Sequence, residues 1–453
     1  MNVFRAKTYA FCGGAFGDEG KGRIVDMIAH DLSIHGPVVV YRDNGGANAG
    51  HTVEFSNGQR VALHQLPSGV FIKRTTVVLG KEMVLHPGDL ITELDQVMNV
   101  SVVTDRATIL IDELALLSLD THRAYESVLK QWQSGGKGST GRGVSPAYAD
   151  VLLRHPLRMR DLISFDEKKI TQHYEMYTAL IKGLGENMEK LTVATLAGES
   201  IVVGNLPTFL KRLKKQADQL RTYVDNVQEF LQKKWKDKKV GFVFEKAQAI
   251  GLDFRWGVYP DITASDTTFD GIFSATQGVI DPDLIKMKAG VIKATYMSSV
   301  GTRKLPTEIK GKLAERIRED AHEYGATTKR PRDIAYLDLP ALKFFSKVGR
   351  LNSLVLTHMD VCYPDQPIQV CIKYQVKGKT VEYQPDQLFL NSVKPVYKKF
   401  APWNVEKLRK ARNFDELPSQ AKKFLQFLSI QFEMPITWIT TGPQREQGIK
   451  IEL

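Results

Sequence analysis

Short apolar runs recur along the chain, and most of them end at glycine-rich or polar turns. They are rich in β-branched and aromatic residues, as buried strands are. Between them, apolar residues recur at three- and four-residue steps, which is the period of a helix that buries one face. Strands that alternate with helices predict an α/β fold with a large, mainly parallel central sheet. The predicted strands are Thr8–Cys12, Val38–Tyr41, Thr76–Leu79, Thr108–Ile111, Gly241–Phe244, Ser353–Thr357 and Thr437–Thr440.

Two further segments interrupt this alternation. Helical periodicity dominates residues 162–236, which we interpret as a mainly helical insertion. Over 211–239, the same periodicity predicts one amphipathic helix with a basic outer face. From about 366 to 385, the runs IQVCIKY and TVEYQ flank VKGK and predict a small antiparallel hairpin. No internal repeat or low-complexity linker is visible, so we expect one α/β domain over residues 1–453 with the insertion inside it.

Composition is that of a globular protein, with 43% apolar and 25% charged residues among 453. No apolar run reaches the length of about 18 residues that a membrane span needs, and the first residues lack the pattern of a secretory signal. The three cysteines, Cys12, Cys362 and Cys371, make neither a disulfide framework nor a zinc cluster. We therefore expect reduced thiols and a cytoplasmic protein.

The net charge of +11 favours anionic partners, and part of it lies in the basic face of 211–239. A solvated face explains that segment best, because no recognisable nucleic-acid-binding motif accompanies it. Nucleic-acid binding stays open as a minor alternative.

A glycine-rich turn that contains a lysine follows the first predicted strand. Its sequence is GAFGDEGKGR, at residues 14–23, and a predicted helix follows. The amides of such a turn attract phosphate, and Lys21 adds a positive charge. The spacing departs from a Walker A loop, which would have glycine in place of Ala15 and a hydroxyl residue in place of Gly22. Asp18 is then the nearest candidate to bind a magnesium ion.

A second polar loop, YRDNGGANAGHT at residues 41–52, also follows a predicted strand. Asn48 can hydrogen-bond the amide-like edge of a base, and Gly50 offers an unshielded carbonyl. His51 can donate a proton or stabilise developing negative charge. Together with the first loop, it makes a nucleotide-binding catalytic site the favoured interpretation.

The two loops resemble the adenylosuccinate synthetase family, whose signatures are WGDEGKGK and GGxNAGHT. Further stretches resemble that family in the same order and extend the resemblance from residue 10 to 443, although the central helical part matches poorly. These stretches are LHQLPSGVF (63–71), GSTGRGVSPAYAD (138–150), LDFRWGVYPDITASDTT (252–268), VGTRKLPTE (300–308), GATTKRPRDIAYLDL (325–339), LTHMDV (356–361) and TTGP (440–443).

The resemblance implies a P-loop-like nucleotide-binding fold and a ligase of AMP biosynthesis that joins L-aspartate to IMP and converts GTP to GDP and phosphate. In that reaction a carboxylate removes the N1 proton, the 6-oxygen attacks the γ-phosphate, and the amine of aspartate displaces phosphate from C6. The resemblance also implies one Mg²⁺ ion at the GTP phosphates. It implies a homodimer in which Arg154 reaches the site across the interface.

The same resemblance implies roles for individual residues. Asp18 is implied as the base and, with the carbonyl of Gly50, as a ligand of the metal. His51 would stabilise the transferred phosphoryl group, Lys21 would hold phosphates, and Gln248 would meet the base. The implied IMP contacts are Asp18, Asn48, Thr140, Arg154, Gln248, Thr263 and Arg330. The implied GTP contacts are Gly17, Glu19, Gly20, Lys21, Gly22, Gly50, Thr52, Arg332, His358, Asp360, Thr440, Gly442 and Pro443. The implied aspartate contacts are Val300, Thr327, Thr328, Arg330 and Arg332.

Four residues depart from the family pattern near the expected substrates. His358 and Ser299 stand where the family has lysine and arginine, and Lys246 and Lys329 stand where it has glycine. These departures leave open the same chemistry on another 6-oxopurine monophosphate such as dGMP, or with another triphosphate. A catalytically silent nucleotide-binding protein is a further alternative, against which the intact catalytic residues argue. The intact Asp18 also argues against dGMP, because relatives that use it tend to lack this carboxylate.

Overall fold

The computed structural model describes residues 4–54, 59–101, 103, 105–132, 139–299, 301–325, 330–442 and 447–451. A ten-stranded sheet forms its centre, and each neighbouring pair of strands is parallel except the last, β20 and β21. In spatial order the strands are β11 (Val224–Asp225), β7 (Thr108–Asp112), β5 (Thr75–Leu79), β2 (Val38–Arg42), β12 (Gly241–Ala249), β1 (Arg5–Gly13), β13 (Ile285–Lys293), β16 (Ser353–Thr357), β20 (Ile436–Thr440) and β21 (Gly448–Lys450).

Every strand predicted from the apolar runs lies in this sheet, so the predicted α/β fold with a mainly parallel sheet is confirmed. The strand β13 was not predicted, because lysines interrupt its apolar run. Two large apolar clusters form the core. Among the described residues, no helix is long and apolar enough to cross a membrane.

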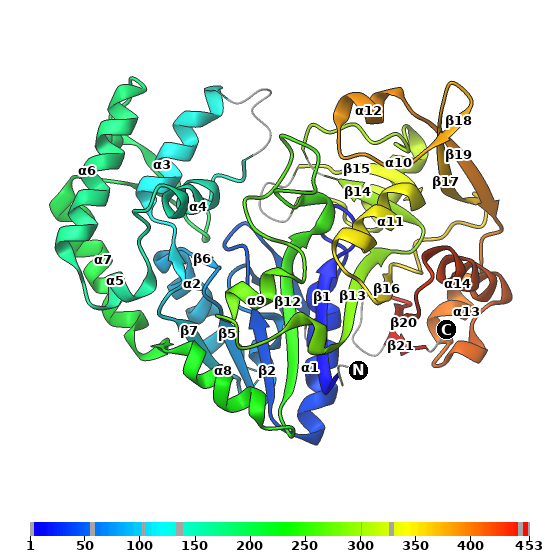
Figure 1. Ribbon diagram of the computed structural model, residues 1–453, viewed down its shortest axis with the longest axis horizontal. Helices are drawn as coiled ribbons and strands as arrows, with labels where there is room; N and C mark the ends of the chain where they lie inside the picture. Colours follow the sequence, from blue (N-terminus) through cyan, green and yellow to red (C-terminus); the bar gives the residue numbers. More distant parts are fainter. Residues whose placement is uncertain are drawn as a thin grey trace.

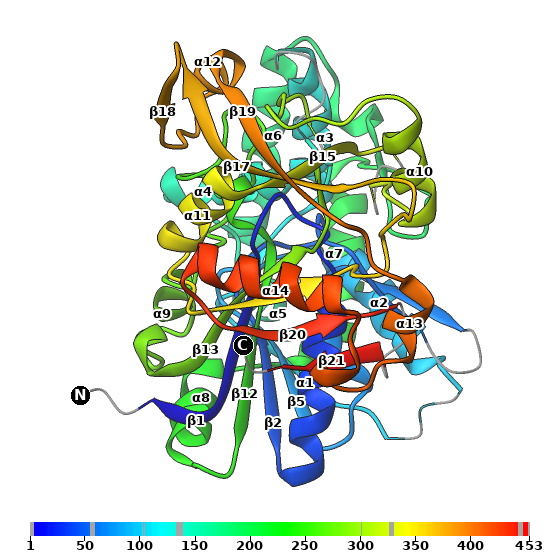
Figure 2. The same cartoon turned by 90° about the vertical axis from the view of Figure 1, so that its right-hand side faces the viewer.

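Helices surround the central sheet, and Figure 1 shows many of them gathered in a lobe beside β7. The helices of that lobe and its neighbourhood are α2 (Pro87–Met98), α3 (Asp120–Leu129), α4 (Val144–Leu152), α5 (Met159–Ile163), α6 (Glu167–Gly183), α7 (Leu206–Leu220) and α8 (Val227–Lys236). The others are α1 (Lys21–His35), α9 (Gly271–Ala275), α10 (Lys312–Asp320), α11 (Leu339–Val348), α12 (Gln387–Ser392), α13 (Val405–Lys410) and α14 (Ser419–Phe432), of which α14 lies beside β20 (Figures 1 and 2).

A second sheet lies on the opposite side of the central sheet from the helical lobe (Figure 1). The predicted hairpin is confirmed within it as β17 (Ile368–Val376) and β18 (Lys379–Val381), which pair in antiparallel fashion. Its other strands are β14 (Tyr296–Ser299), β15 (Asp333–Asp338) and β19 (Lys394–Phe400). Short two-stranded pairs are β3 (His51–Glu54) with β4 (Arg60–Leu63), β6 (Val84–Leu85) with β8 (Leu116–Leu117), and β9 (Thr192–Ala194) with β10 (Ser200–Val202).

The prediction of one helix over 211–239 is wrong. The helix α7 ends at Leu220, and Val224 and Asp225 then pair with β7 as the edge strand of the central sheet. A new helix begins after Asn226, whose side chain accepts a hydrogen bond from the backbone amide of Glu229. Apolar periodicity alone could not reveal the break, because Val224 falls in phase with the helical pattern while it pairs with a strand.

Several loops that carry the sequence motifs leave the carboxyl ends of parallel strands. The first motif follows β1, the second follows β2, and Gln248 lies at the end of β12. His358 follows β16 and Gly442 follows β20. Because these strands are neighbours in one parallel sheet, their carboxyl ends meet along one edge, where ligands bind in such folds.

Candidate active site

A cavity of about 760 Å³ opens at this edge of the sheet. Both glycine-rich loops line it, together with the end of β12 and the segment that leads into β15. Many of the predicted site residues therefore come together. Those that line the cavity are Gly17, Asp18, Gly20, Lys21, Gly22, Asn48, Gly50, His51, Thr140, Gln248, Thr263, Arg330 and Arg332.

The first loop is shaped by Glu19, whose side chain turns into the loop. Its carboxylate accepts hydrogen bonds from the amides of Ala15 and Gly17, at 3.3 and 2.7 Å, and pairs with Lys21 at 3.0 Å. Gly22 allows the second loop to approach, because a Cβ there would stand 2.7 Å from the Cβ of His51. Glu19 thus holds the glycine-rich turn together.

Asp18 reaches the cavity from a left-handed backbone conformation, with φ of 57°. Its carboxylate forms an ion pair with the guanidinium of Arg332, which also pairs with Glu323 at 2.6 Å. Glu323 is buried, and it accepts further bonds from Lys293 and from the hydroxyl of Tyr296. Burial alone would raise the pKa of Glu323, but Lys293 and Arg332 outweigh it and hold that pKa far below its usual range. Arg332 is therefore a fixed bridge between two carboxylates.

His51 lies against a second carboxylate, that of Glu245 on β12. The Nδ1 atom of His51 is 3.9 Å from Glu245, which also accepts bonds from the amide and hydroxyl of Ser68 at 2.9 and 2.7 Å. Burial lowers the pKa of His51 to about 4 in the ligand-free protein. The imidazole is thus neutral at pH 7 and can donate one hydrogen bond into the cavity.

Several buried polar atoms on the cavity wall lack a hydrogen-bond partner among the residues that the structure describes. They include Nε2 of His51, Nε2 of Gln248 and Oγ1 of Thr263. Buried polar groups are nearly always paired in folded proteins, and each exception calls for an explanation. A polar ligand in the cavity would supply the missing partners.

The ends of β2 and β12 are tied together beside this wall. The side chain of Asn44 accepts a bond from the amide of Ala247 at 2.8 Å and donates to Ser265 at 2.9 Å. Lys246 is fully buried and forms an ion pair with Asp43. This pair explains the lysine that departs from the family pattern, because it stabilises a buried acid of the neighbouring loop.

The predicted guanine-binding residues form a separate group beside the first loop and do not line the cavity. The amide of His358 donates to Oγ1 of Thr440 at 3.2 Å, and Asp360 pairs with Arg409 at 3.0 Å. The group adjoins the cavity at Gly20, where a Cβ would stand 3.9 Å from Cε1 of His358. Gly442 lies close by, since its carbonyl accepts a bond from Arg23 of α1.

Arg154 lies outside the cavity, on the surface just beyond α4. Its neighbours Leu152 and Leu153 are 84% and 66% exposed, which is unusual for two successive leucines. The remaining predicted contacts lie outside the described residues: Val300, Thr327, Thr328, Pro443 and the side chain of Thr52.

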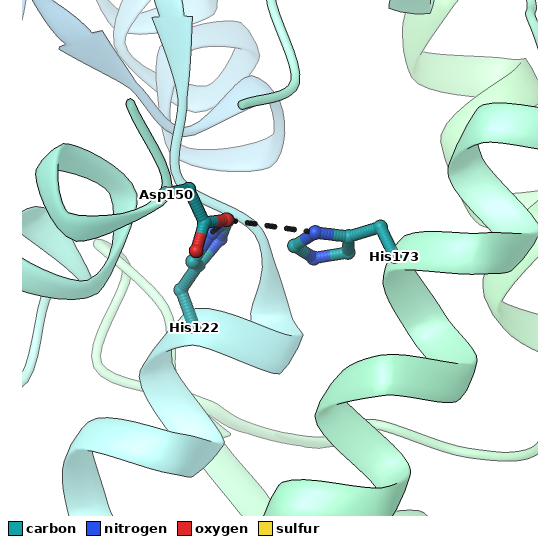
Figure 3. Close-up of side chains that lie close together, drawn as sticks. All are labelled: His122, Asp150 and His173. Carbon is teal, nitrogen blue, oxygen red and sulfur yellow. Dashed lines mark hydrogen bonds and ion pairs between the residues drawn. The ribbon is translucent and has the colours of Figure 1, made fainter. Parts of the chain in front are cut away.

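Among the residues that the structure describes, two groups offer candidate ligands for a metal ion. The first comprises Asp18 and the carbonyl of Gly50, which line the same cavity and are the oxygen ligands that Mg²⁺ prefers. The second comprises the buried side chains of His122, Asp150 and His173 (Figure 3).

The second group is a hydrogen-bond network rather than a metal site. Nδ1 of His122 accepts a bond from the amide of Leu119 at 2.8 Å, so its Nε2 carries the proton and donates to Asp150 at 3.0 Å. That nitrogen has no lone pair for a metal. Asp150 also accepts a bond from the hydroxyl of Tyr177 at 2.9 Å, and the network joins α3, α4 and α6.

Glu245, Glu323 and Lys293 are site residues that no sequence motif indicated. Glu245 and Lys293 lie inside strands, and Glu323 precedes a predicted loop by a few residues. A buried charge inside an apolar strand was the available signal, since such a charge needs a partner.

The chain is similar to known proteins along nearly its whole length. The family model described as adenylosuccinate synthetase matches residues 10–449. The adenylosuccinate synthetases of Clostridium botulinum and Clostridium perfringens are 33% and 34% identical to this chain over 450 residues, which is 98% of this chain and 99% of each relative. The fully ligated enzyme from Plasmodium falciparum has a similar structure, with a TM-score of 0.86 and 30% identity over 98% of this chain and 100% of that one.

A more distant structure shares the fold alone. The succinoaminodeoxyadenylate synthetase of cyanophage S-2L, bound to dGMP and dATP, matches with a TM-score of 0.59 and 16% identity. The match covers 98% of this chain and 94% of that one.

Proposed function

The chain belongs to the adenylosuccinate synthetase family, and on that basis we propose how its own residues perform the reaction of a ligase that joins L-aspartate to IMP. The reaction uses GTP and gives adenylosuccinate, GDP and phosphate. IMP is favoured over dGMP as the acceptor, because the phage enzyme bound to dGMP shares only the fold.

One observation carries the assignment of residues. The unpartnered atoms of His51, Gln248 and Thr263 line the same cavity as the carboxylate of Asp18. A purine monophosphate offers what this wall lacks: an amide-like base edge for Gln248 and phosphate oxygens for the hydroxyl of Thr263. We assign Asn48 to the base, and Thr140 and Arg330 to the same nucleotide.

Asp18 is the proposed base. Its carboxylate removes the proton from N1 of IMP, and the electron pair moves to the 6-oxygen, which attacks the γ-phosphorus of GTP and releases GDP. The aspartate amine then adds at C6, the C6–O bond breaks, and phosphate leaves with the transferred oxygen. Arg332 occupies one side of the Asp18 carboxylate and so orients the other oxygen for the proton.

His51 and Lys21 stabilise the charge that develops on the phosphoryl group. His51 is neutral in the ligand-free site, and its unpartnered Nε2 is the proposed donor to the phosphoryl group, in the tautomer that carries the proton on that nitrogen. Lys21 is held by Glu19 beside the amides of the first loop, which would surround the phosphates. Asp360 would accept hydrogen bonds from the guanine edge, with His358, Thr440 and the segment at Gly442 around the base.

We propose Mg²⁺ as the metal that this family requires, held by the carboxylate of Asp18 and the carbonyl of Gly50. When bound, the ion would neutralise charge on the GTP phosphates. Arg330 is proposed to grip a carboxylate of aspartate, because guanidinium groups bind carboxylates in bidentate fashion. Arg332, whose terminal nitrogens are held by Asp18 and Glu323, is proposed to add its positive charge to the same aspartate site.

We infer a homodimer from the surface beyond α4. Leu152 and Leu153 expose apolar side chains immediately before Arg154, and a second copy would cover them. Arg154 would then reach the IMP phosphate of the partner. A cytoplasmic location agrees with Cys12, Cys362 and Cys371, all of which are free and buried.

The test is phosphate release by the purified protein with Mg²⁺ and aspartate, over a matrix of IMP, GMP and dGMP against GTP and ATP. We expect release with IMP and GTP and none when aspartate is omitted. Release with dGMP or ATP in preference would show that the departures at Ser299 and His358 have changed the substrates. No release with any pair would refute the function.

A further inference from the structure

Arg303 is a buried cation on the wall of the catalytic cavity, and none of the roles described so far includes it. It is 3% exposed and belongs to the segment that follows β14. Its guanidinium carbon lies 4.7 Å from the centre of the Phe16 ring, which belongs to the first loop and lines the same cavity. The side chain is therefore packed against the catalytic loop.

Neutral groups hold this cation in place. Nη1 donates to Oγ of Ser299 at 2.8 Å, and Nη2 donates to the backbone carbonyl of Asp261. The Nε atom has no partner among the residues that the structure describes, and it shares this property with Nε2 of Gln248 and Oγ1 of Thr263 on the same wall.

The charge of Arg303 is also incompletely compensated. No carboxylate of the described residues forms an ion pair with it, and the carboxylate of Asp261 accepts bonds from the amide and hydroxyl of Thr302 instead, at 2.9 and 2.8 Å. Burial lowers the pKa of Arg303 to about 10, so the group stays protonated at neutral pH. The carboxylates of Asp261 and Asp333 oppose this shift only in part. A buried cation without a directly paired counter-ion is costly, and an anion in the cavity would reduce that cost.

The position of this cation explains one departure from the family pattern. Ser299 stands where the family has an arginine. Arg303 lies four residues farther along the chain, and its guanidinium donates a hydrogen bond to the Ser299 hydroxyl. The small side chain of Ser299 leaves room for it and supplies an acceptor.

We propose that Arg303 is a further substrate-binding residue, which binds the ribose-phosphate part of the purine monophosphate. The proposal rests on the function proposed above and extends its IMP site. The carbonyl of Asp261 fixes the guanidinium two residues before Thr263, whose unpartnered hydroxyl is assigned to the 5′-phosphate. Arg303 and Thr263 thus present a cation and a donor on adjoining parts of one wall, which suits an anionic sugar phosphate.

The experiment compares R303M, R303K and the wild type by calorimetric binding of IMP alone, followed by measurement of KM for IMP, aspartate and GTP. We expect the Kd of R303M for IMP to rise about tenfold or more, as for a lost hydrogen bond to a charged group. The KM values for aspartate and GTP should stay within about twofold. Lysine in R303K keeps the positive charge but lacks the planar guanidinium with its several donors. Its Kd for IMP should therefore lie between those of the wild type and R303M.

The matched control is K304M, which removes a positive charge from the neighbouring exposed residue of the same segment and should bind IMP as the wild type does. If R303M does not fold, R303K alone decides the question. An unchanged Kd for IMP, or a rise confined to the KM for aspartate, would overturn the proposal. Wild-type protein that binds IMP but releases no phosphate would refute the proposed function instead, because IMP binding is measured without turnover.

Discussion

The carboxylate of Asp18 and the guanidinium of Arg332 form an ion pair, although 314 residues separate them in the chain. The contact joins the first glycine-rich loop to the segment that leads into β15, and so links the proposed base to the proposed aspartate site. Arg332 in turn is anchored on the buried Glu323. The predictions below test this arrangement and the residues around it.

Replacement of Asp18 by Asn should lower kcat about 100-fold or more, because the amide cannot accept the N1 proton. IMP binding should persist, since the nucleotide keeps its contacts with Gln248 and Thr263. The measurements are steady-state phosphate release and calorimetric binding of IMP. D365N, which breaks the exposed ion pair between Arg316 and Asp365, is the control and should keep full activity. Near-normal turnover by D18N would remove Asp18 as the base.

Replacement of Glu323 by Gln should reduce the free energy of unfolding by about 3 kcal/mol or more. Loss of this charge leaves Lys293 and Arg332 without their buried counter-ion, and such uncompensated charges are costly. Urea unfolding followed by circular dichroism measures the difference. D365N serves again as the control, because its ion pair is exposed and contributes little. Equal stability of E323Q and the wild type would contradict the buried network.

Replacement of Arg330 by Leu should raise the KM for aspartate about tenfold or more and leave the KM for IMP less affected, because one guanidinium is lost from the proposed clamp on the dicarboxylate. Arg330 lines the cavity and is exposed, so the variant should fold normally. R350L, which removes a surface arginine paired with Asp270 and Asp283, is the matched control. An unchanged KM for aspartate would show that Arg330 does not contact this substrate.

The ligand-free protein should lose stability in mild acid partly through His358. Burial, together with Lys293 and Arg23, lowers the pKa of His358 to about 4, and Glu323 and Asp360 only partly oppose this shift. An unfolded histidine has a pKa of about 6.5, so between these values the unfolded chain binds a proton that the folded chain does not, and stability falls as the pH falls.

Between pH 7.5 and 5, this difference amounts to about 2 kcal/mol. The wild type should therefore lose about 2 kcal/mol more than H358N over that interval in urea unfolding. Parallel loss in the two proteins would mean that the His358 imidazole is not held neutral in the folded state.

Arg154 provides a test of the dimer. R154L and D18N should each be inactive alone, and mixing the two after reversible dissociation should restore about a quarter of wild-type activity through hybrid dimers with one intact site. Restoration requires that Arg154 acts on the partner's IMP. Native mass spectrometry checks that hybrid dimers form. If they form and activity does not recover, Arg154 acts in its own subunit's site or in no site.

The sequence predicted the fold where the apolar pattern is continuous. Strands such as Val38–Arg42 and Ser353–Thr357 are buried on both faces, and their unbroken apolar runs made them visible. The strand Ile285–Lys293 escaped prediction because it contains lysines. Lys288 and Lys293 are nevertheless buried, paired with Asp283 and Glu323. Only the folded chain shows that these charges are compensated.

The candidate site also contains residues that the sequence marks and residues that only the folded chain brings together. Asp18 and His51 stand in glycine-rich motifs, and the family resemblance pointed to Gln248, so the sequence could single these residues out. Glu323 and Arg303 stand in no recognised pattern, and their importance comes from what they contact across the fold. The division into one domain with an insertion at 162–236 stays a prediction. The sequence does account for the helical character of that insertion, but not for the strand at Val224–Asp225.

Asp18, Gln248 and His358 all adopt the left-handed backbone conformation, with φ between 56° and 58°. Each such residue costs about 1 kcal/mol relative to glycine, which tolerates this conformation freely. A redesign guided only by thermal stability would therefore choose these positions among the first to change to glycine. Such a variant would melt at a higher temperature and would lose the proposed base, the amide that reads the purine and the ring beside the guanine pocket.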